Sequence, residues 1–192
     1  MKITNYKFQN LKKRVRTGRT PVVIGITGLI ASGKTTVAGV FRRDGFKVID
    51  VDEFARSLYK KGLPLYSALV KKYGKIILLG NGEISRKELA KLAFKDTKQY
   101  LSFCGLVFKF LNRSLKSMIC KLNVKTVVLD MAVLFESGFY RYCDSIILVK
   151  SPEAGIRERL KKLKNRVNVK KALKFQKIFK MNKKIALSDF II

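Results

Sequence analysis

Runs that are hydrophobic at almost every position alternate with amphipathic stretches along this chain. Three of the runs are rich in β-branched residues: "VVIGIT" at residues 22–27, "VKTVVLD" at residues 124–130 and "SIILV" at residues 145–149. This texture is typical of parallel strands that are buried on both faces. A shorter run, "FKVID" at residues 46–50, follows a glycine-rich turn and a predicted short helix, and it predicts another strand. Strand, loop, helix and strand in this order indicate the α/β class with a parallel sheet.

The region between the second and third predicted strands has helical periodicity. Its amphipathic segments end near glycines, and "GNGEISRKELAKLAF" predicts a turn followed by a helix. Ser85 is the expected N-cap of that helix, with Glu88 at the spacing of a capping box. Residues 97–122 are rich in Leu and Phe and predict a longer helix. From Ser151 onward the chain is strongly basic and is predicted to be helical.

Composition narrows the class of protein. With 192 residues, 47% of them hydrophobic, the chain is long enough for one α/β domain with a small inserted subdomain. No apolar run approaches the roughly 18–20 residues of a membrane span, so none is predicted. The three cysteines, Cys104, Cys120 and Cys143, form no CxxC pair and are expected to be reduced thiols in a cytoplasmic protein.

The charge of the chain is strongly positive. Its 42 Lys and Arg residues outnumber 13 Asp and Glu residues, which gives a formal net charge of +29. Such an excess favours an anionic partner, either nucleic acid or a small polyphosphate, although broad solvated basic surfaces give the same composition. Residues 1–20 contain seven Lys and Arg residues and no acid. We expect them to form a flexible basic arm before a domain that spans residues 21–192.

Residues 28–36 read "GLIASGKTT" and match G-x-x-x-x-G-K-[ST] at every fixed position. The glycines permit a tight loop whose backbone N–H groups point at phosphate oxygens, and the following helix adds the positive end of its dipole. Lys34 is expected to reach the β- and γ-phosphates of ATP, and Thr35 to ligate Mg²⁺. The residues predicted to bind ATP are Gly28, Ile30, Ala31, Ser32, Gly33, Lys34, Thr35 and Thr36.

Three aspartates follow predicted strands at the edge of the sheet where this loop lies. Asp130 ends "KTVVLD", a position like that of a Walker B aspartate, where it would orient Mg²⁺ or its waters; a turn-capping aspartate is the alternative. Asp50 and Asp52 close the second strand as "IDVD", and alternation predicts both on the same side of an extended segment. One is expected to act as general base toward an attacking hydroxyl and the other as a hydrogen-bonding support, with helix capping as the alternative.

Arg157, Arg159 and Arg166 lie in the basic region after the last predicted strand. Phosphoryl transfer needs fixed positive charge, commonly on a closing segment, and these arginines suit that role. A solvated basic helix face and a nucleic-acid surface are the alternatives. Because the chain has no recognisable RNA- or DNA-reading motif, we expect nucleic acid to bind only non-specifically through charge.

Several segments, taken in order, resemble the dephospho-coenzyme A kinases. They include "VIGITGLIASGKTTVAGVF", "GFKVIDVDEFAR", "YGKIILLGNGEISRKELAKLAFKD" and "VVLDMAVLFESG". The P-loop is common to many NTPases, whereas D-x-D-x-x-A-R, G-x-I-x-R-x-x-L and VLFE are specific to this family in combination. The resemblance covers nearly all of residues 22–192 and implies a P-loop kinase-type parallel sheet flanked by helices. It also implies a helical substrate-binding insertion at about residues 55–122 and a short lid at about residues 157–170.

The resemblance further implies a reaction: phosphorylation of the ribose 3′-hydroxyl of dephospho-CoA by ATP with Mg²⁺, the last step of coenzyme A synthesis. It identifies Asp52 as the proposed general base, and it places Asp52, Arg56 and Arg86 on the substrate side. Glu136 belongs to the VLFE motif. The predicted catalytic residues are Lys34, Asp52, Arg159 and Arg166, and the predicted metal ligands are Thr35 and Asp130.

The chain departs from this family in three places, one of them at "DFII", where family members usually continue with an Asn-containing segment and a final helix. A His-Pro pair that the family carries has no counterpart, because Leu106 and Val107 stand there and the chain contains no histidine. The register of the lid is also shifted, so the second lid cation is Arg166, or Leu163 or a nearby lysine takes its place. The alternative functions are another nucleoside or nucleotide kinase, or a catalytically degenerate P-loop protein that binds nucleic acid.

Overall fold

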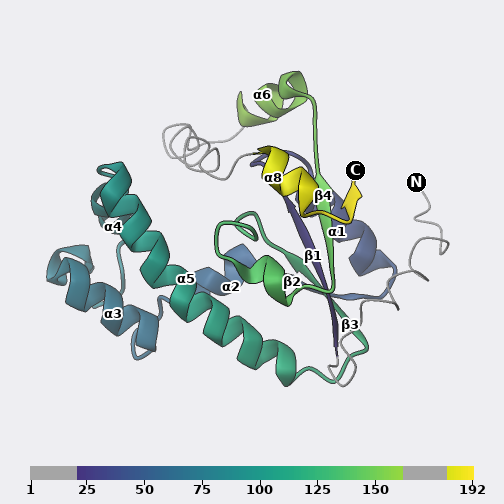
Figure 1. The fold of residues 1–192 in the computed structure, drawn as a ribbon. Helices are drawn as coiled ribbons and strands as arrows, with labels where there is room; N and C mark the ends of the chain where they lie inside the picture. Colours follow the sequence, from purple (N-terminus) through teal and green to yellow (C-terminus); the bar gives the residue numbers. More distant parts are fainter. Residues whose placement is uncertain (1–20, 162–180) are drawn as a thin grey trace. The chain divides into compact units, whose positions relative to one another are not determined.

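The computed structural model describes residues 21–161 and 181–192, which belong to two compact units (Figure 1). Residues Val51–Met118 make one unit, and the chain on either side of them makes the other. Residues 1–20, the predicted basic arm, lie outside the described residues. So do residues 162–180, which hold Arg166 and most of the predicted lid.

A five-stranded sheet forms the centre of the unit that carries the glycine-rich loop. Its order is β2-β3-β1-β4-β5, and each neighbouring pair is parallel. The strands are β1 (Val22–Gly28), β2 (Lys47–Asp50), β3 (Thr126–Asp130), β4 (Ser145–Val149) and β5 (Phe190–Ile191). The central strand β1 is buried at every position after its first, as its continuous hydrophobic run requires. The predicted α/β class with a parallel sheet is therefore confirmed.

Helix α1 (Lys34–Arg43) covers one face of this sheet, which confirms the predicted short helix between the first two strands. Phe41 packs there against Ile26 of β1 in a shared hydrophobic cluster. The opposite face is packed closely at Gly25, because a Cβ on this glycine would lie 2.7 Å from Leu134 Cδ2. Both faces of β1 are thus covered, and this packing holds the start of the loop that follows β1 in place.

The prediction of helix throughout the C-terminal tail is wrong at its end. Helices α6 (Glu153–Lys161) and α8 (Met181–Ala186) are present, but β5 then adds a parallel strand beside β4. Lys150 N donates to Ile192 O at 2.7 Å, and Ile192 N donates to Leu148 O at 3.0 Å. These backbone pairs hold the strand, and two paired residues are too few to produce a recognisable hydrophobic run.

The second unit is helical. Its elements are α2 (Val51–Ser57), α3 (Pro64–Tyr73), the 3-10 helix η2 (Lys75–Ile77), α4 (Arg86–Ala93) and most of α5 (Thr97–Cys120). Leu65, Leu69 and Val107 belong to its hydrophobic core. The predicted N-cap of α4 is confirmed, since Ser85 Oγ accepts a hydrogen bond from Glu88 N at 3.3 Å. Within the described residues, no helix combines the length and hydropathy that a membrane crossing requires.

Candidate functional site

The loop between β1 and α1 has positions where most other residues would clash or be strained. Gly28 ends β1, and a Cβ there would lie 2.3 Å from Val149 O and 2.6 Å from Ser32 Oγ. Gly33 precedes α1 in the left-handed region with a φ of 100°, and Ala31 has a φ of 63°. No side chain caps the N-terminus of α1 in this described segment. A tight loop that leads into an uncapped helix N-terminus has the backbone geometry for binding phosphates.

Two of the predicted catalytic cations border this loop. Lys34 Nζ donates to Leu29 O at 3.2 Å, which holds the ammonium group over the loop. Arg159 of α6 reaches the same loop, because a Cβ on Gly33 would lie 3.5 Å from Arg159 Nη1. Arg159 Nε donates to Gly155 O at 2.9 Å, and this bond orients the guanidinium. The structure therefore brings Lys34 and Arg159 together, as the predicted donor site requires.

Oxygen ligands suited to a divalent cation gather at the end of the sheet beside the loop. Asp50 and Asp130 are register partners at the last positions of β2 and β3, and the Thr35 side chain hydrogen-bonds to Asp130. In the part of the chain that the structure describes, no three His, Cys, Asp or Glu side chains form a metal-binding group. Mg²⁺ commonly takes only one or two protein carboxylates and completes its shell with water and substrate phosphates. A hydroxyl beside a carboxylate therefore fits Mg²⁺ as a partial ligand set.

The protonation of Asp130 reflects this crowded position. The residue is 7% exposed, and burial raises the pKa of its carboxyl. The Asp50 carboxylate raises this pKa further, whereas the Lys34 ammonium and the Thr35 hydrogen bond lower it. Because burial is the largest cause, the folded chain disfavours the charged carboxylate, and a cation bound there would favour it.

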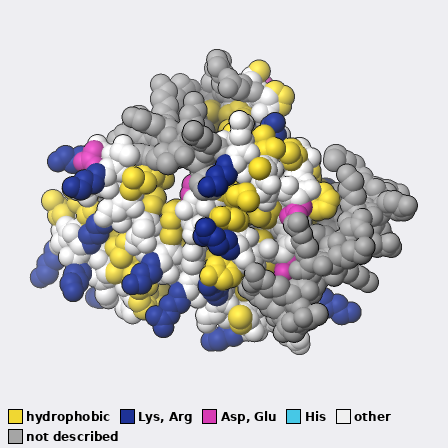
Figure 2. Space-filling view, viewed as in Figure 1, with side chains coloured by type: hydrophobic (Ala, Val, Ile, Leu, Met, Phe, Trp, Pro, Cys, Tyr) yellow, Lys and Arg dark blue, Asp and Glu magenta, His cyan; other side chains and the backbone are white. Residues whose placement is uncertain are grey.

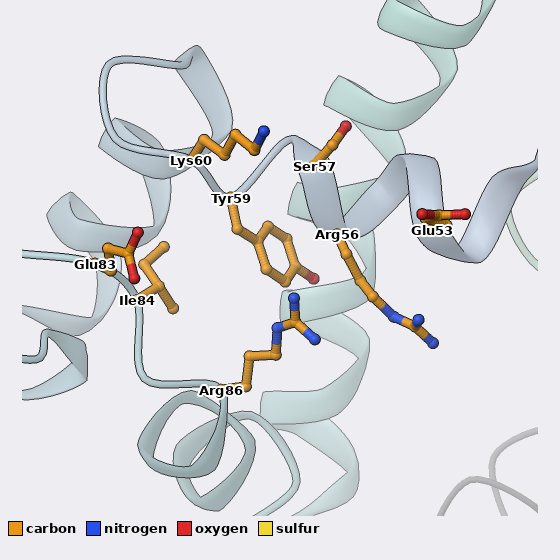
Figure 3. Close-up of a pocket in the computed structure, with 8 residues that line it drawn as sticks. All are labelled: Glu53, Arg56, Ser57, Tyr59, Lys60, Glu83, Ile84 and Arg86. Carbon is orange, nitrogen blue, oxygen red and sulfur yellow. The ribbon is translucent and has the colours of Figure 1, made fainter.

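The helical unit contains a pocket of its own, with a volume of about 460 Å³ (Figure 3). It brings together the two predicted substrate arginines, Arg56 from the end of α2 and Arg86 from the start of α4. In Figure 3 the Tyr59 hydroxyl points toward the Arg86 guanidinium, whereas the Arg56 side chain extends away from the Tyr59 ring. The pocket is also lined by Glu53, Ser57, Lys60, Glu83 and Ile84. Two exposed guanidinium groups at one pocket suit an anionic ligand.

The position of Asp52 corrects one step of the sequence analysis. Strand β2 ends at Asp50, and Asp52 lies in the first turn of α2, so the two aspartates do not alternate along one extended segment. An acidic residue in the first turn of a helix is favoured by the helix dipole, and this preference explains the early helix start. Asp52 is exposed, and it does not line the pocket formed with Arg56 and Arg86.

Sequence reasoning missed two residues that the structure brings into view. Lys184 of α8 is buried, and its Nζ lies 2.6 Å from Glu136 Oε1. This ion pair joins α8 to the segment after β3 that contains the VLFE motif. Tyr59 is the other residue, and it lies in the turn that follows α2, where its N donates to Arg56 O at 3.2 Å. Lys184 is one of many lysines in the tail, and only the apolar residues that follow it could have indicated that it is buried.

Positive charge is not confined to these sites. Figure 2 shows Lys and Arg side chains dispersed over the visible described surface, among hydrophobic and polar atoms and with few acidic groups. A dispersed field attracts polyanions in general, whereas a nucleic-acid interface concentrates basic residues along one face.

Comparison with known proteins gives a consistent result over most of the chain. The family model for dephospho-CoA kinase matches residues 22–192. A dephospho-CoA kinase from Aquifex aeolicus is 33% identical over 171 residues, which cover 88% of this chain and 86% of that protein. One from Bacillus licheniformis is 34% identical over 155 residues, which cover 79% of this chain and 77% of that protein.

Solved structures agree with this result at the level of the fold. The crystal structure of the Thermus thermophilus protein TT1252 superposes with a TM-score of 0.73 at 26% identity. The match covers 90% of this chain and 88% of that one. Together with the family match, this similarity confirms the predicted P-loop kinase-type fold.

Proposed function

The chain belongs to the dephospho-CoA kinase family, and on that basis we propose that it transfers the γ-phosphate of ATP to the ribose 3′-hydroxyl of dephospho-CoA. The products are coenzyme A and ADP, and the reaction is the last step of coenzyme A synthesis. The observation that carries this proposal is the family match over residues 22–192, because it spans both the loop-bearing unit and the helical unit. The P-loop alone is common to many kinases and NTPases.

On the donor side, residues 28–36 bind the phosphates of ATP in this proposal, with Lys34 and Arg159 as the cations that stabilise charge on the transferring group. Support comes from the proximity of both side chains to the same loop. Thr35 and Asp130 would hold Mg²⁺ or its waters, and the ion supplies neutralising charge at the phosphates when it is bound. Arg166 is proposed as a further lid cation, and it lies outside the described residues.

On the acceptor side, Asp52 is the proposed general base. Its carboxylate would take the proton of the 3′-hydroxyl as that oxygen attacks the γ-phosphorus and ADP leaves. Its exposed position, two residues after the strand end beside Asp130, supports this role. Arg56 and Arg86 would bind anionic groups of dephospho-CoA, which is supported by their shared pocket.

We also place the reaction in the cytoplasm. Cys104, Cys120 and Cys143 are all free thiols, as expected for a protein that works in a reducing compartment.

A coupled ATP-consumption assay on the full chain tests the proposed reaction. Dephospho-CoA is offered with ATP and Mg²⁺ beside adenosine, AMP and CMP as alternative acceptors. We expect turnover that depends on dephospho-CoA and exceeds that with the other three. Turnover with another acceptor, and none with dephospho-CoA, would assign the chain to a different nucleoside or nucleotide kinase activity.

A further inference from the structure

Tyr59 occupies a position in the helical unit that its hydrophobic neighbours do not explain. Its ring packs beside the core cluster of that unit, which includes Leu65 and Leu69. Its hydroxyl, however, lies in the pocket with Arg56 and Arg86 (Figure 3). A phenol used only for packing usually gives its hydroxyl a protein acceptor or leaves it in open solvent. Here the hydroxyl points toward the Arg86 guanidinium, which has no acceptor to offer, and Cys104 is a further neighbour.

Two other tyrosines of the same unit, Tyr66 and Tyr73, provide a comparison. Tyr66 donates its hydroxyl hydrogen to Gly82 O at 2.6 Å, so its polar atom has a protein partner. The Tyr73 hydroxyl is enclosed and without a hydrogen-bond partner within the described residues, and Tyr73 does not line this pocket. Tyr59 alone of these three combines a hydroxyl that faces the pocket with two nearby cations.

The two arginine side chains of the pocket can also bind a ligand. Within the described ranges, neither Arg56 nor Arg86 forms a side-chain ion pair or hydrogen bond, and both are exposed at the pocket. The acid Glu83, which also lines the pocket, accepts instead from Asn81 Nδ2 at 3.3 Å. Two guanidinium forks and one phenol therefore present donors, and an oxyanion with several oxygens provides acceptors for all of them.

We propose that Tyr59 is a specificity-determining residue whose hydroxyl donates a hydrogen bond to a phosphate oxygen of the acceptor, between the forks of Arg56 and Arg86. The inference rests on the proposed function, because dephospho-CoA carries a diphosphate group of this chemistry. The pocket of about 460 Å³ is large enough for such a group and part of what is attached to it. Burial keeps the phenol protonated well above neutral pH, with a pKa raised to about 12, so that it remains a donor under all working conditions.

The test compares two variants that each lose one hydroxyl group, Tyr59→Phe and Tyr73→Phe, in the full chain. Binding of dephospho-CoA is measured by titration calorimetry without ATP, and KM and kcat are measured in the coupled assay. Because a hydrogen bond to a charged group is lost, Tyr59→Phe should weaken dephospho-CoA binding by about ten-fold or more. The KM for ATP and kcat should stay within about two-fold, and Tyr73→Phe should bind dephospho-CoA like the wild type.

Dephospho-CoA affinity within two-fold of wild type for Tyr59→Phe would overturn the inference, and so would equal losses in both variants, since these would indicate a general effect on the unit. The proposed function fails separately. If the wild-type chain does not phosphorylate dephospho-CoA, both proposals fall; if it does and Tyr59→Phe is unchanged, only the role of Tyr59 falls.

Discussion

Asp50 and Asp130 stand opposite each other as register partners at the carboxyl ends of two neighbouring parallel strands. Asp130 is 7% exposed, and the neighbouring Asp50 carboxylate opposes its ionisation. Such an arrangement costs stability in the absence of a cation, and proteins retain it where a site needs the charge. The Thr35 hydroxyl, which hydrogen-bonds to Asp130, and the nearby Lys34 ammonium stabilise the Asp130 carboxylate and offset part of this cost.

This relationship predicts that Asp130→Asn stabilises the chain at neutral pH while it impairs turnover. The folded-state pKa of Asp130 is raised by burial, so the stability that its protonated form contributes is fully present below the unfolded pKa and lost as pH rises through the folded pKa. The amide keeps a partner for Thr35 without the buried charge. Urea unfolding without Mg²⁺ should show the variant to be the more stable at pH 7, with the difference shrinking toward pH 4. Exposed Asp44→Asn is the control, and equal effects of the two substitutions would refute the explanation.

Lys34→Ala should lower kcat by about a hundred-fold to a thousand-fold, because a positioned charge at the transferring phosphate is lost. The fold should persist, since Lys34 lies at the start of α1 and its Nζ bonds to Leu29 O of the adjoining loop. Steady-state kinetics with dephospho-CoA measure the loss, and Lys121→Ala, at an exposed lysine after α5, controls for the change in net charge. A near-normal kcat in Lys34→Ala would remove the loop from the catalytic site.

Asp52→Asn separates chemistry from nucleotide binding. If Asp52 is the general base, kcat should fall by about 100-fold or more while ATP affinity stays near that of the wild type. The matched variant Asp50→Asn changes a carboxylate at the strand end two residues earlier. A large loss of kcat in Asp50→Asn, with Asp52→Asn unaffected, would transfer the role to Asp50.

The donor side could be predicted from sequence because its constraints are local. Gly28, Gly33 and Lys34 are fixed by one loop, and the cap between Ser85 and Glu88 spans a single helical turn. What sequence could not supply depends on tertiary contacts. Strand β5 consists of two residues held by backbone pairing.

The pocket of the helical unit depends on contacts of the same kind. Tyr59 and Arg86 lie 27 positions apart in sequence, and only the tertiary structure of the unit brings both to one pocket. Asp52 was misplaced because "IDVD" fits the end of a strand as well as the start of a helix.

The ion pair of Lys184 and Glu136 predicts a large effect on stability. Lys184 is 1% exposed and its Nζ lies 2.6 Å from Glu136 Oε1, so Lys184→Met would leave a carboxylate that is only 14% exposed without this partner. Removing one member of such a pair costs about 3–5 kcal/mol in free energy of unfolding. Urea unfolding measures this, with exposed Lys183→Met as the control.

A double variant tests the explanation for that loss. Glu136→Leu combined with Lys184→Met removes both charges, and it should recover much of the stability that Lys184→Met loses, because apolar groups of similar volume can replace a buried pair. No recovery in the double variant would show that Lys184 acts through packing rather than through Glu136.

The phenol of Tyr59 should ionise unusually late. Burial raises its pKa from 10.0 to about 12, with the neighbouring Cys104 adding to the shift and the Arg86 and Arg56 guanidinium groups opposing it. Because the chain has seven tyrosines and no tryptophan, tyrosinate absorbance reports their ionisation without interference. We expect a component near pH 12 that Tyr59→Phe removes and that Tyr66→Phe leaves in place.

The raised folded-state pKa of Tyr59 also means that stability from the protonated phenol is present below pH 10.0 and lost as pH rises through about 12. Tyr59→Phe should therefore lose less stability than the wild type across that interval, and a titration curve unchanged by the substitution would show that the phenol is not held in the environment described for it.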